Sequence, residues 1–315
     1  MPAVTAPVVL LAFNRPALTQ KVLDALRLAQ PSRLLLVADG PRAGHPADAQ
    51  ACARVRALLD KGVDWPAEVS RNYAPQNLGL RRRVSSGLTW AFQQVDEAII
   101  LEDDCIPDSS FFLFCTELLE HFKADSRVGV ITGNNFQPPG RASKHSYYFS
   151  RFNHCWGWAT WRRAWRLFDG DMAAWPELKA SGWLDGLFPE AGHARYWSDA
   201  FDRAYERRID SWAFCWTFSC WSQNLLTAIP KSNLVSNIGF GPGSTHTTDP
   251  ASPLANLPAR AMDFPLSHPA TMVRDHLADD YSQRTVFGSI SPGSVSSEAA
   301  SLENPGKRRK FFSWG

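Results

Sequence analysis

The sequence has no apolar run of the roughly 18 residues that a membrane-spanning helix needs. Its 33 basic and 31 acidic groups give a net charge of +2, so no charge excess favours a nucleic-acid partner. The six cysteines contain no CxxC pair, and the N-terminal residues carry no basic cluster of the kind that begins a secretory signal. We therefore expect a cytoplasmic protein with reduced, buried cysteines and with no nucleic acid among its partners.

Glycine-rich phosphate loops are also missing. The first apolar run, residues 8–13, ends in Asn14-Arg15-Pro16 rather than in a GxGxxG sequence, and no Walker lysine loop occurs. This pattern argues against a dinucleotide-dependent enzyme and against a P-loop ATPase. A sugar-nucleotide pyrophosphorylase would need a glycine-rich loop with a basic residue after the first strand, and residues 12–16 do not provide it.

What the sequence does contain is an alternation of apolar runs with segments of helical periodicity. Buried strands are expected at 8–13, 34–38 and 99–101 and a short strand at 68–71, with helices between them. This order predicts an α/β fold with a mostly parallel, doubly wound central sheet that is flanked by helices. A further strand is expected at 128–132, and further helices after Asp108 and over 194–209.

The composition changes along the chain. From residue 134 the periodicity fails and aromatic residues dominate, and ten of the 13 tryptophans lie between Trp156 and Trp221. We expect one domain over 1–248, made of a ligand-binding half, 1–133, and an aromatic-rich half, 134–248. Residues 249–315, rich in proline, serine and aspartate, are expected to form a partly ordered C-terminal tail.

The chain's most informative feature is Glu102-Asp103-Asp104, which directly follows a buried strand. In open α/β sheets, ligands bind at the carboxyl ends of the strands. Three adjacent carboxylates repel one another and are costly to desolvate unless a positive charge compensates them. Mg²⁺ or Mn²⁺ would do so and would leave coordination positions for phosphate oxygens. The alternative is an acidic turn in solvent.

Two other strand ends are expected at the same edge of the sheet. Arg15 follows the first strand and Asp39 follows the second. Arginine offers two parallel donors to phosphate oxygens, and an aspartate accepts from a base N–H or a ribose hydroxyl. Together with a metal ion they suit a nucleoside diphosphate. The run Arg81-Arg82-Arg83 would add positive charge, although the alternative for these arginines is a solvated helix end.

Four motifs taken together, residues 12–16, 39–40, 77–80 and 101–104, resemble those of GT-A fold glycosyltransferases in order and spacing. The resemblance covers about residues 7–248 and is nearest to bacterial family-2-like enzymes. More distantly, the chain resembles Golgi β-1,2-N-acetylglucosaminyltransferases. The resemblance implies a UDP-linked sugar donor, with UDP-GlcNAc as one choice, and Mn²⁺ or Mg²⁺ held mainly by Asp104. It also implies that the donor is bound by Arg15, Asp39, Asn77, Arg81, Glu102 and Asp103.

The second half also fits this resemblance. Asp210-Ser211-Trp212 corresponds to an Asp-Asp-Trp of the Golgi enzymes, although Ser211 replaces the second carboxylate. An inverting transfer needs a carboxylate that takes the proton of the acceptor hydroxyl. Asp210 is the candidate base, with Asp199 and Asp202 as alternatives. The alternative to a catalytic role is that Asp210 lies in a loop and caps a helix.

Three more residues are assigned from their surroundings. His246 lies in a Gly/Ser/Thr segment that suits a closing lid. The resemblance to GT-A enzymes implies that this histidine completes the metal or pyrophosphate site, and a solvated loop histidine is the alternative. Trp156 and Trp158 lie in the densest aromatic stretch and are expected to bind the acceptor, because aromatic faces stack on sugar rings. Core packing is the alternative for most of the tryptophans.

Near the C-terminus, Lys307–Lys310 precede Phe311, Phe312 and Trp314. Basic residues beside aromatic ones favour weak contact with an anionic membrane, so residues 307–314 are expected to touch the inner face of the cytoplasmic membrane. A disordered soluble tail is the alternative.

The expected function is a metal-dependent inverting glycosyltransferase, either a hexosyltransferase or an N-acetylhexosaminyltransferase. It would act on a saccharide or lipid-linked saccharide acceptor in bacterial envelope polysaccharide or lipopolysaccharide synthesis. A catalytically inactive sugar-nucleotide-binding regulatory protein and a membrane-bound scaffold are the alternatives.

Overall fold

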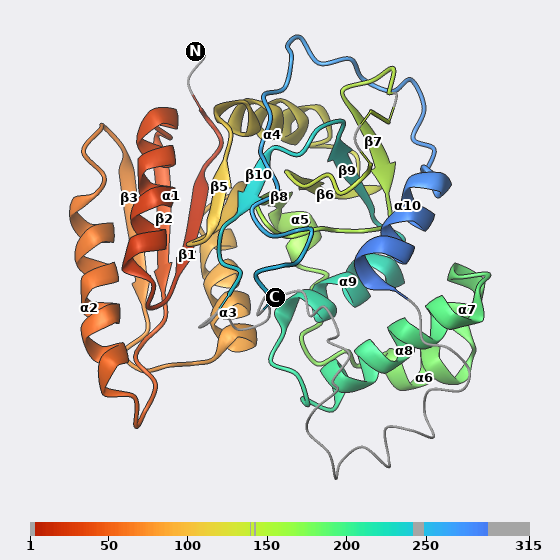
Figure 1. Cartoon of the computed structure of the whole chain (residues 1–315), viewed down its shortest axis with the longest axis horizontal. Coiled ribbons are helices and arrows are strands. Elements are labelled where there is room, and N and C mark those ends of the chain that lie inside the picture. The colour runs from red at the N-terminus through yellow and green to blue at the C-terminus, as the bar shows by residue number, and fades with distance from the viewer. Residues whose placement is uncertain (1–3, 139, 142, 242–248, 289–315) are drawn as a thin grey trace.

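The computed structural model describes residues 4–138, 140–141, 143–241 and 249–288. An eight-stranded sheet runs through the protein in the order β3-β2-β1-β4-β8-β6-β9-β7 (Figure 1). Neighbours among its first four strands pair in parallel, namely β1 (Val8–Ala12), β2 (Arg33–Ala38), β3 (Glu68–Tyr73) and β4 (Glu97–Glu102). This part of the sheet confirms the four strands expected from the sequence.

The other half of the sheet mixes strand directions. β6 (Val128–Thr132) and β9 (Leu226–Pro230) are parallel to one another. Two antiparallel strands complete it, β8 (Trp158–Trp161) between β4 and β6, and β7 (Tyr147–Ser150) at the edge beside β9. The expected α/β architecture, a mostly parallel central sheet flanked by helices, is therefore confirmed, and two antiparallel strands are added to it.

The helices of the first half follow from right-handed crossovers between parallel strands. The chain moves outward from β1 to β3 and then returns to β4, which places α3 on the other face from α1 and α2. The contacts agree, because α1 packs on α2 and α4 whereas α3 packs on α5 and α9. Helices on both faces bury β1, β2 and β4, which explains their continuous apolar runs. These helices are α1 (Pro16–Ala29), α2 (Pro46–Lys61), α3 (Leu80–Phe92) and α4 (Ser109–His121).

The aromatic half is a tryptophan-rich core. Trp158 stacks on Trp212 with ring centroids 5.6 Å apart, and Trp165 and Trp216 lie 5.3 Å from each other beside them. Every residue from 212 to 221 is buried, so this helix has no polar face and no helical periodicity in its sequence. The helices here are α5 (Arg162–Trp165), α6 (Trp175–Ala180), α7 (Trp183–Leu187), α8 (Ala191–Tyr205) and α9 (Trp212–Ser222).

Residues 249–288, the described part of the expected tail, pack on the body of the protein. They include α10 (His276–Ser282) and the π-helical turn η1 (Gln283–Phe287). The amide of Asp275 donates to the carbonyl of Phe149 (2.8 Å), and Trp197 Nε1 donates to Gln283 Oε1 (2.7 Å). The expected division of the chain into two halves and a tail stays a prediction.

Two predictions from composition can be compared with the structure. All six cysteines are free and buried, as expected for core thiols. No helix among the described residues is long and apolar enough to cross a membrane. The basic segment 307–314, expected to touch the membrane, lies outside the described residues, so that expectation and the expected cellular location stay predictions.

Candidate functional site

The acidic triplet lies at the centre of the carboxyl edge of the sheet. β1 lies between β2 and β4, so the segments that follow these three strands are neighbours. The amide of Asp39 donates to the carbonyl of Ala12 (3.0 Å), and the amide of Phe13 donates to Asp103 Oδ2 (3.2 Å). The convergence expected from the strand ends is therefore present in the fold.

Arg15 is the counter-ion of the triplet in this structure. Its Nη1 lies 2.8 Å from Asp104 Oδ2, and its other terminal nitrogen donates to Asp103. Both carboxylates are buried, with 2% and 6% of the residue exposed. Burial alone would lower the pKa of Arg15, but the negative charges of Asp103 and Asp104 outweigh it and raise that pKa. The arginine expected to hold phosphate thus compensates the carboxylates in this arrangement.

Glu102 completes an oxygen-rich cluster that fits a divalent cation. Its Oε1 is buried and has no hydrogen-bond partner among the described residues. Burial, followed by the charge of Asp104, raises the pKa of Glu102 to about 8. Burial also raises the pKa of Asp103, although Arg15 opposes that effect. An unsatisfied carboxylate oxygen beside further carboxylates is the donor set that Mg²⁺ and Mn²⁺ prefer.

Gly239 packs against the side chain of Asp104, and it is not among the site residues expected from the sequence. A short antiparallel ribbon of β5 (Cys105–Pro107) and β10 (Val235–Asn237) leads to it. The amide of Ile238 then donates to the carbonyl of Asp104 (2.9 Å). A Cβ atom at position 239 would lie 2.0 Å from Asp104 Oδ2, so this position requires glycine. Because this contact joins segments that lie far apart in the chain, no local pattern in the sequence shows it.

Asp39 forms a second polar cluster with the segment that leads into α3. It is 4% exposed and accepts from Asn77 Nδ2 (2.9 Å) and from the amides of Leu78 (2.9 Å) and Gly40 (2.8 Å). Burial raises the pKa of Asp39, although the two amides lower it. The structure thus brings the predicted pair Asp39 and Asn77 together as mutual partners, and their contact with a nucleotide stays a prediction.

Asp210 binds the other end of the same segment. Its Oδ2 accepts from the amide of Leu80 (2.8 Å) and its Oδ1 accepts from the amide of Arg81 (3.0 Å). A carboxylate at the N-terminus of a helix satisfies amides that have no partner within the helix and interacts favourably with the helix dipole. Asp210 therefore caps α3 from a distant part of the chain, and its catalytic role stays a prediction.

Arg81, by contrast, does not lie free beside the site. Its Nη1 donates to the carbonyl of Ala204 (2.7 Å), and its other terminal nitrogen donates to the carbonyl of Gly170. The side chain thereby attaches α3 to the end of α8 and to the segment before α6. Nucleotide binding by Arg81 would require these bonds to break.

The two alternative bases lie on α8, and both have structural partners. Asp202 accepts from Trp175 Nε1 (3.0 Å) and from Lys179 Nζ (2.7 Å). Asp199 lies 4.0 Å from Arg203 on the same helix. These contacts explain both carboxylates as parts of the helical half.

The predicted acceptor tryptophans are buried. Trp158 is 1% exposed and belongs to the tryptophan core, so its ring faces other rings rather than solvent. Trp156 is 4% exposed, and its ring lies edge-on to Phe240, 5.4 Å away. Phe240 directly follows Gly239, and the burial of Trp156 favours packing over stacking on a sugar. His246, expected as a metal ligand, lies outside the described residues.

A second group of possible metal ligands lies on the helical half. Ligand atoms of Glu190, His193 and Asp280 lie within 4.8 Å of one another. Arg284, however, lies 2.6 Å from Glu190 and 3.2 Å from Asp280. A side-chain cation already balances these acids, so this group is explained as an ion-pair network.

A comparison with known protein families finds no match, and neither does a comparison with curated proteins. Solved structures show a faint likeness. A UDP-glucose pyrophosphorylase complexed with UDP-glucose aligns at 11% identity and a TM-score of 0.26, over 41% of this chain and 56% of its own. The galactosyltransferase LgtC, in complex with donor and acceptor sugar analogs, aligns at 14% and 0.30, over 52% of this chain and 60% of its own.

HddC from Yersinia pseudotuberculosis aligns at 12% identity and a TM-score of 0.31, over 50% of this chain and 78% of its own. This chain thus spans little more than half the length of the first two structures. A likeness of this size does not assign a function. No similarity to Golgi N-acetylglucosaminyltransferases is shown, and that part of the resemblance stays a prediction.

Proposed function

We propose that this protein is a metal-dependent inverting glycosyltransferase that uses a nucleotide-sugar donor. The observation that carries the proposal is the cluster of Glu102, Asp103 and Asp104 at the carboxyl end of the central strand, compensated by Arg15 and covered by Gly239. Such a cluster is costly to keep in a fold unless it binds something. The donor is proposed to be UDP-linked, with UDP-GlcNAc as one choice.

The residues of the chain have separate roles in this proposal. Glu102 and Asp104 would hold Mn²⁺ or Mg²⁺, which when bound supplies positive charge against the departing diphosphate. Arg15 carries a fixed positive charge at the same edge and can turn its two parallel N–H groups toward phosphate oxygens. Asp39 and Asn77 would position the nucleoside.

Asp210 is proposed as the group that accepts the proton of the acceptor hydroxyl. Its carboxylate accepts from two amides at the N-terminus of α3, which fix its position at the start of that helix. The transfer would serve bacterial envelope polysaccharide or lipopolysaccharide synthesis, and the acceptor would be a saccharide, free or lipid-linked.

The test is a panel of nucleotide sugars incubated with the protein, with and without Mn²⁺, followed by measurement of the released nucleoside diphosphate. We expect hydrolysis of at least one UDP-sugar that stops when a chelator is added. Asp104→Asn should lose this activity, whereas Asp64→Asn, which changes an exposed carboxylate paired with Arg27, should retain it. Activity that survives the chelator and the Asp104 change would contradict the proposal.

One observation favours a second candidate. Because Asp210 already caps α3, it is fully explained without catalysis. The second candidate is a sugar-nucleotide-binding regulatory protein without transferase activity. Metal-dependent binding of a UDP-sugar by titration calorimetry, without turnover over hours, would identify it.

A further inference from the structure

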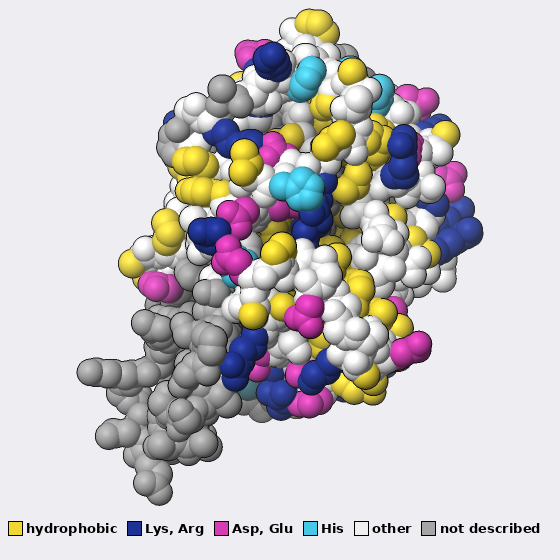
Figure 2. Space-filling model, turned by 90° about the vertical axis from the view of Figure 1, so that its right-hand side faces the viewer, with side chains coloured by type: hydrophobic (Ala, Val, Ile, Leu, Met, Phe, Trp, Pro, Cys, Tyr) yellow, Lys and Arg dark blue, Asp and Glu magenta, His cyan; other side chains and the backbone are white. Residues whose placement is uncertain are grey.

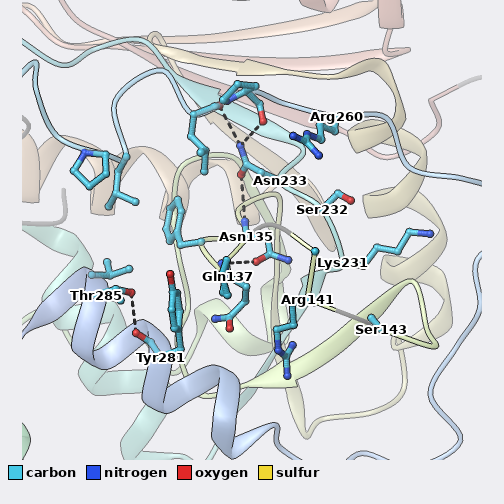
Figure 3. A pocket seen from close by; sticks show the side chains of 18 of the residues that line it. Asn135, Gln137, Arg141, Ser143, Lys231, Ser232, Asn233, Arg260, Tyr281 and Thr285 are labelled. Atoms are coloured by element: carbon cyan, nitrogen blue, oxygen red, sulfur yellow. Dashed lines mark hydrogen bonds between the residues drawn. The ribbon is translucent and has the colours of Figure 1, made fainter.

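A cavity of about 570 Å³ opens on the second half of the protein (Figure 3). Its walls come from the segments after β6 and β9, from residues 253–260 and from α10 with η1. Figure 3 shows Ser232, Lys231 and Arg260 along one side and Tyr281 and Thr285 on the opposite side. A volume of this size accommodates a small molecule or a few sugar units.

The cavity lies at the same edge of the sheet as the acidic triplet. β6 and β9 are parallel to β4 through the pairings with β8, so the segments after them leave the sheet at its carboxyl edge. From Asn233 in the cavity wall the chain runs through β10 directly to Gly239 above Asp104. A molecule in the cavity would therefore lie on the acceptor side of the proposed donor site.

The described residues of the lining carry positive charge only. They include Arg141, Lys231 and Arg260 and no aspartate or glutamate. Elsewhere the signs are mixed, and on the face seen in Figure 2 basic and acidic side chains are interspersed. A lining of one sign in a concave site attracts ligands of the opposite sign.

The three cations are not equally compensated. Lys231 lies 3.1 Å from Asp263, a side chain that is 89% exposed, and Arg141 pairs with Asp275. No carboxylate among the described residues pairs with the side chain of Arg260. Arg260 is therefore the lining cation with the most capacity to bind an anion.

The uncharged lining suits a sugar. Its polar part includes Asn135, Gln137, Tyr148 and Tyr281, and its apolar part includes Leu254 and Leu257. Asn135 is fixed in place, because its Nδ2 donates to the carbonyl of Pro230 (2.7 Å) and its Oδ1 accepts from the amide of Gln137 (2.8 Å). Aromatic rings and pre-positioned polar groups are typical of carbohydrate-binding sites.

We propose that this cavity binds the acceptor and selects a saccharide that carries an anionic group, either a carboxylate or a phosphate. The inference rests on the proposed function, because it assigns the acceptor of the same enzyme. Arg260 binds the anionic group, and Lys231 and Arg141 add positive charge around it. A neutral saccharide would leave the charge of Arg260 uncompensated.

The test is titration calorimetry with trigalacturonic acid, glucose 6-phosphate, maltotriose and inorganic phosphate. We expect the protein to bind one of the two acidic sugars and to bind maltotriose at least about tenfold more weakly, the usual worth of one charged hydrogen bond. Arg260→Gln should weaken binding of the acidic sugar by about tenfold or more. Arg54→Gln, a change at an exposed arginine of α2, should have no effect.

Each outcome decides part of the inference. Equal binding of maltotriose and the acidic sugars, or no binding of either acidic sugar, would overturn it. Inorganic phosphate that binds as tightly as glucose 6-phosphate would overturn the saccharide assignment. Binding of an acidic sugar without any UDP-sugar turnover would leave the cavity assigned and remove the proposed function. Turnover of a UDP-sugar that does not distinguish acidic from neutral acceptors would support the proposed function and overturn the assignment of an anionic acceptor to the cavity.

Discussion

The ion pairs of Arg15 give the sharpest test of the site. Arg15→Gln would remove the cation that contacts both Asp103 and Asp104, and leave these carboxylates buried without it. Removing one partner of a buried ion pair costs about 3–5 kcal/mol. Because 28% of the Arg15 side chain is exposed, we expect the lower end, a loss of about 3 kcal/mol in the free energy of unfolding.

A divalent cation should reverse this loss. It would supply the missing positive charge without competing with Arg15 for the carboxylates. At a concentration one hundred times its Kd, an ion that binds only the folded state stabilises it by about 2.7 kcal/mol. Mn²⁺ should therefore stabilise Arg15→Gln by about that amount, and by more than it stabilises the unchanged protein.

The measurement is urea unfolding at neutral pH, with and without Mn²⁺, compared with a control in α1, the helix that Arg15 precedes. Arg27→Gln removes an arginine whose partners Asp24 and Asp64 are exposed, so its effect should stay below about 1 kcal/mol and should not respond to Mn²⁺. If the two variants lost equal amounts of free energy of unfolding, the role of Arg15 as counter-ion would be refuted. A Mn²⁺ effect no larger in Arg15→Gln than in the unchanged protein would refute the metal site.

Three further predictions concern other groups. Asp210→Asn should lower kcat for transfer by about two to four orders of magnitude. Asparagine caps a helix about as well as aspartate, so this variant and the control Asp108→Asn, at the cap of α4, should both leave the free energy of unfolding nearly unchanged. A normal kcat would make Asp210 a cap alone. Burial lowers the pKa of His154 from 6.5 to about 3, so below pH 6.5 the unfolded chain takes up a proton that the folded chain does not. Stability should thus fall as the pH drops, by about 2 kcal/mol between pH 8 and pH 5 from this group, and urea unfolding of His154→Phe should lack that part of the decrease. Gly239→Ala should abolish the Mn²⁺-dependent rise in melting temperature, because its Cβ would occupy the space of the carboxylate beneath it, whereas Gly186→Ala, in open space, should retain it.

The sequence by itself determined the first half of the fold. Strands buried on both faces must be apolar throughout, so β1, β2 and β4 are visible as continuous runs. Asp108, expected to cap a helix, does accept from the amide of Ser110 (2.9 Å) at the start of α4. Polar residues directly after apolar runs also showed which strand ends would meet, because parallel strands share a carboxyl edge.

The second half was decided by tertiary contacts. β8 is inserted antiparallel between β4 and β6, and no local pattern specifies a strand's neighbours. α9 is buried on every side, and a helix without a polar face loses the periodicity by which helices are recognised.

The roles of single residues at the site also depend on the folded chain. The charge of Arg15 suggested a phosphate ligand, but the fold places it against two buried carboxylates. Asp210 lies 130 positions from Leu80 in the sequence, so the residues around Asp210 do not indicate that it contacts α3. The requirement for glycine at position 239 arises only because β10 pairs with β5 above Asp104. A sequence lists the charges and the steric constraints of a chain, whereas the pairing of distant segments decides which charges compensate one another.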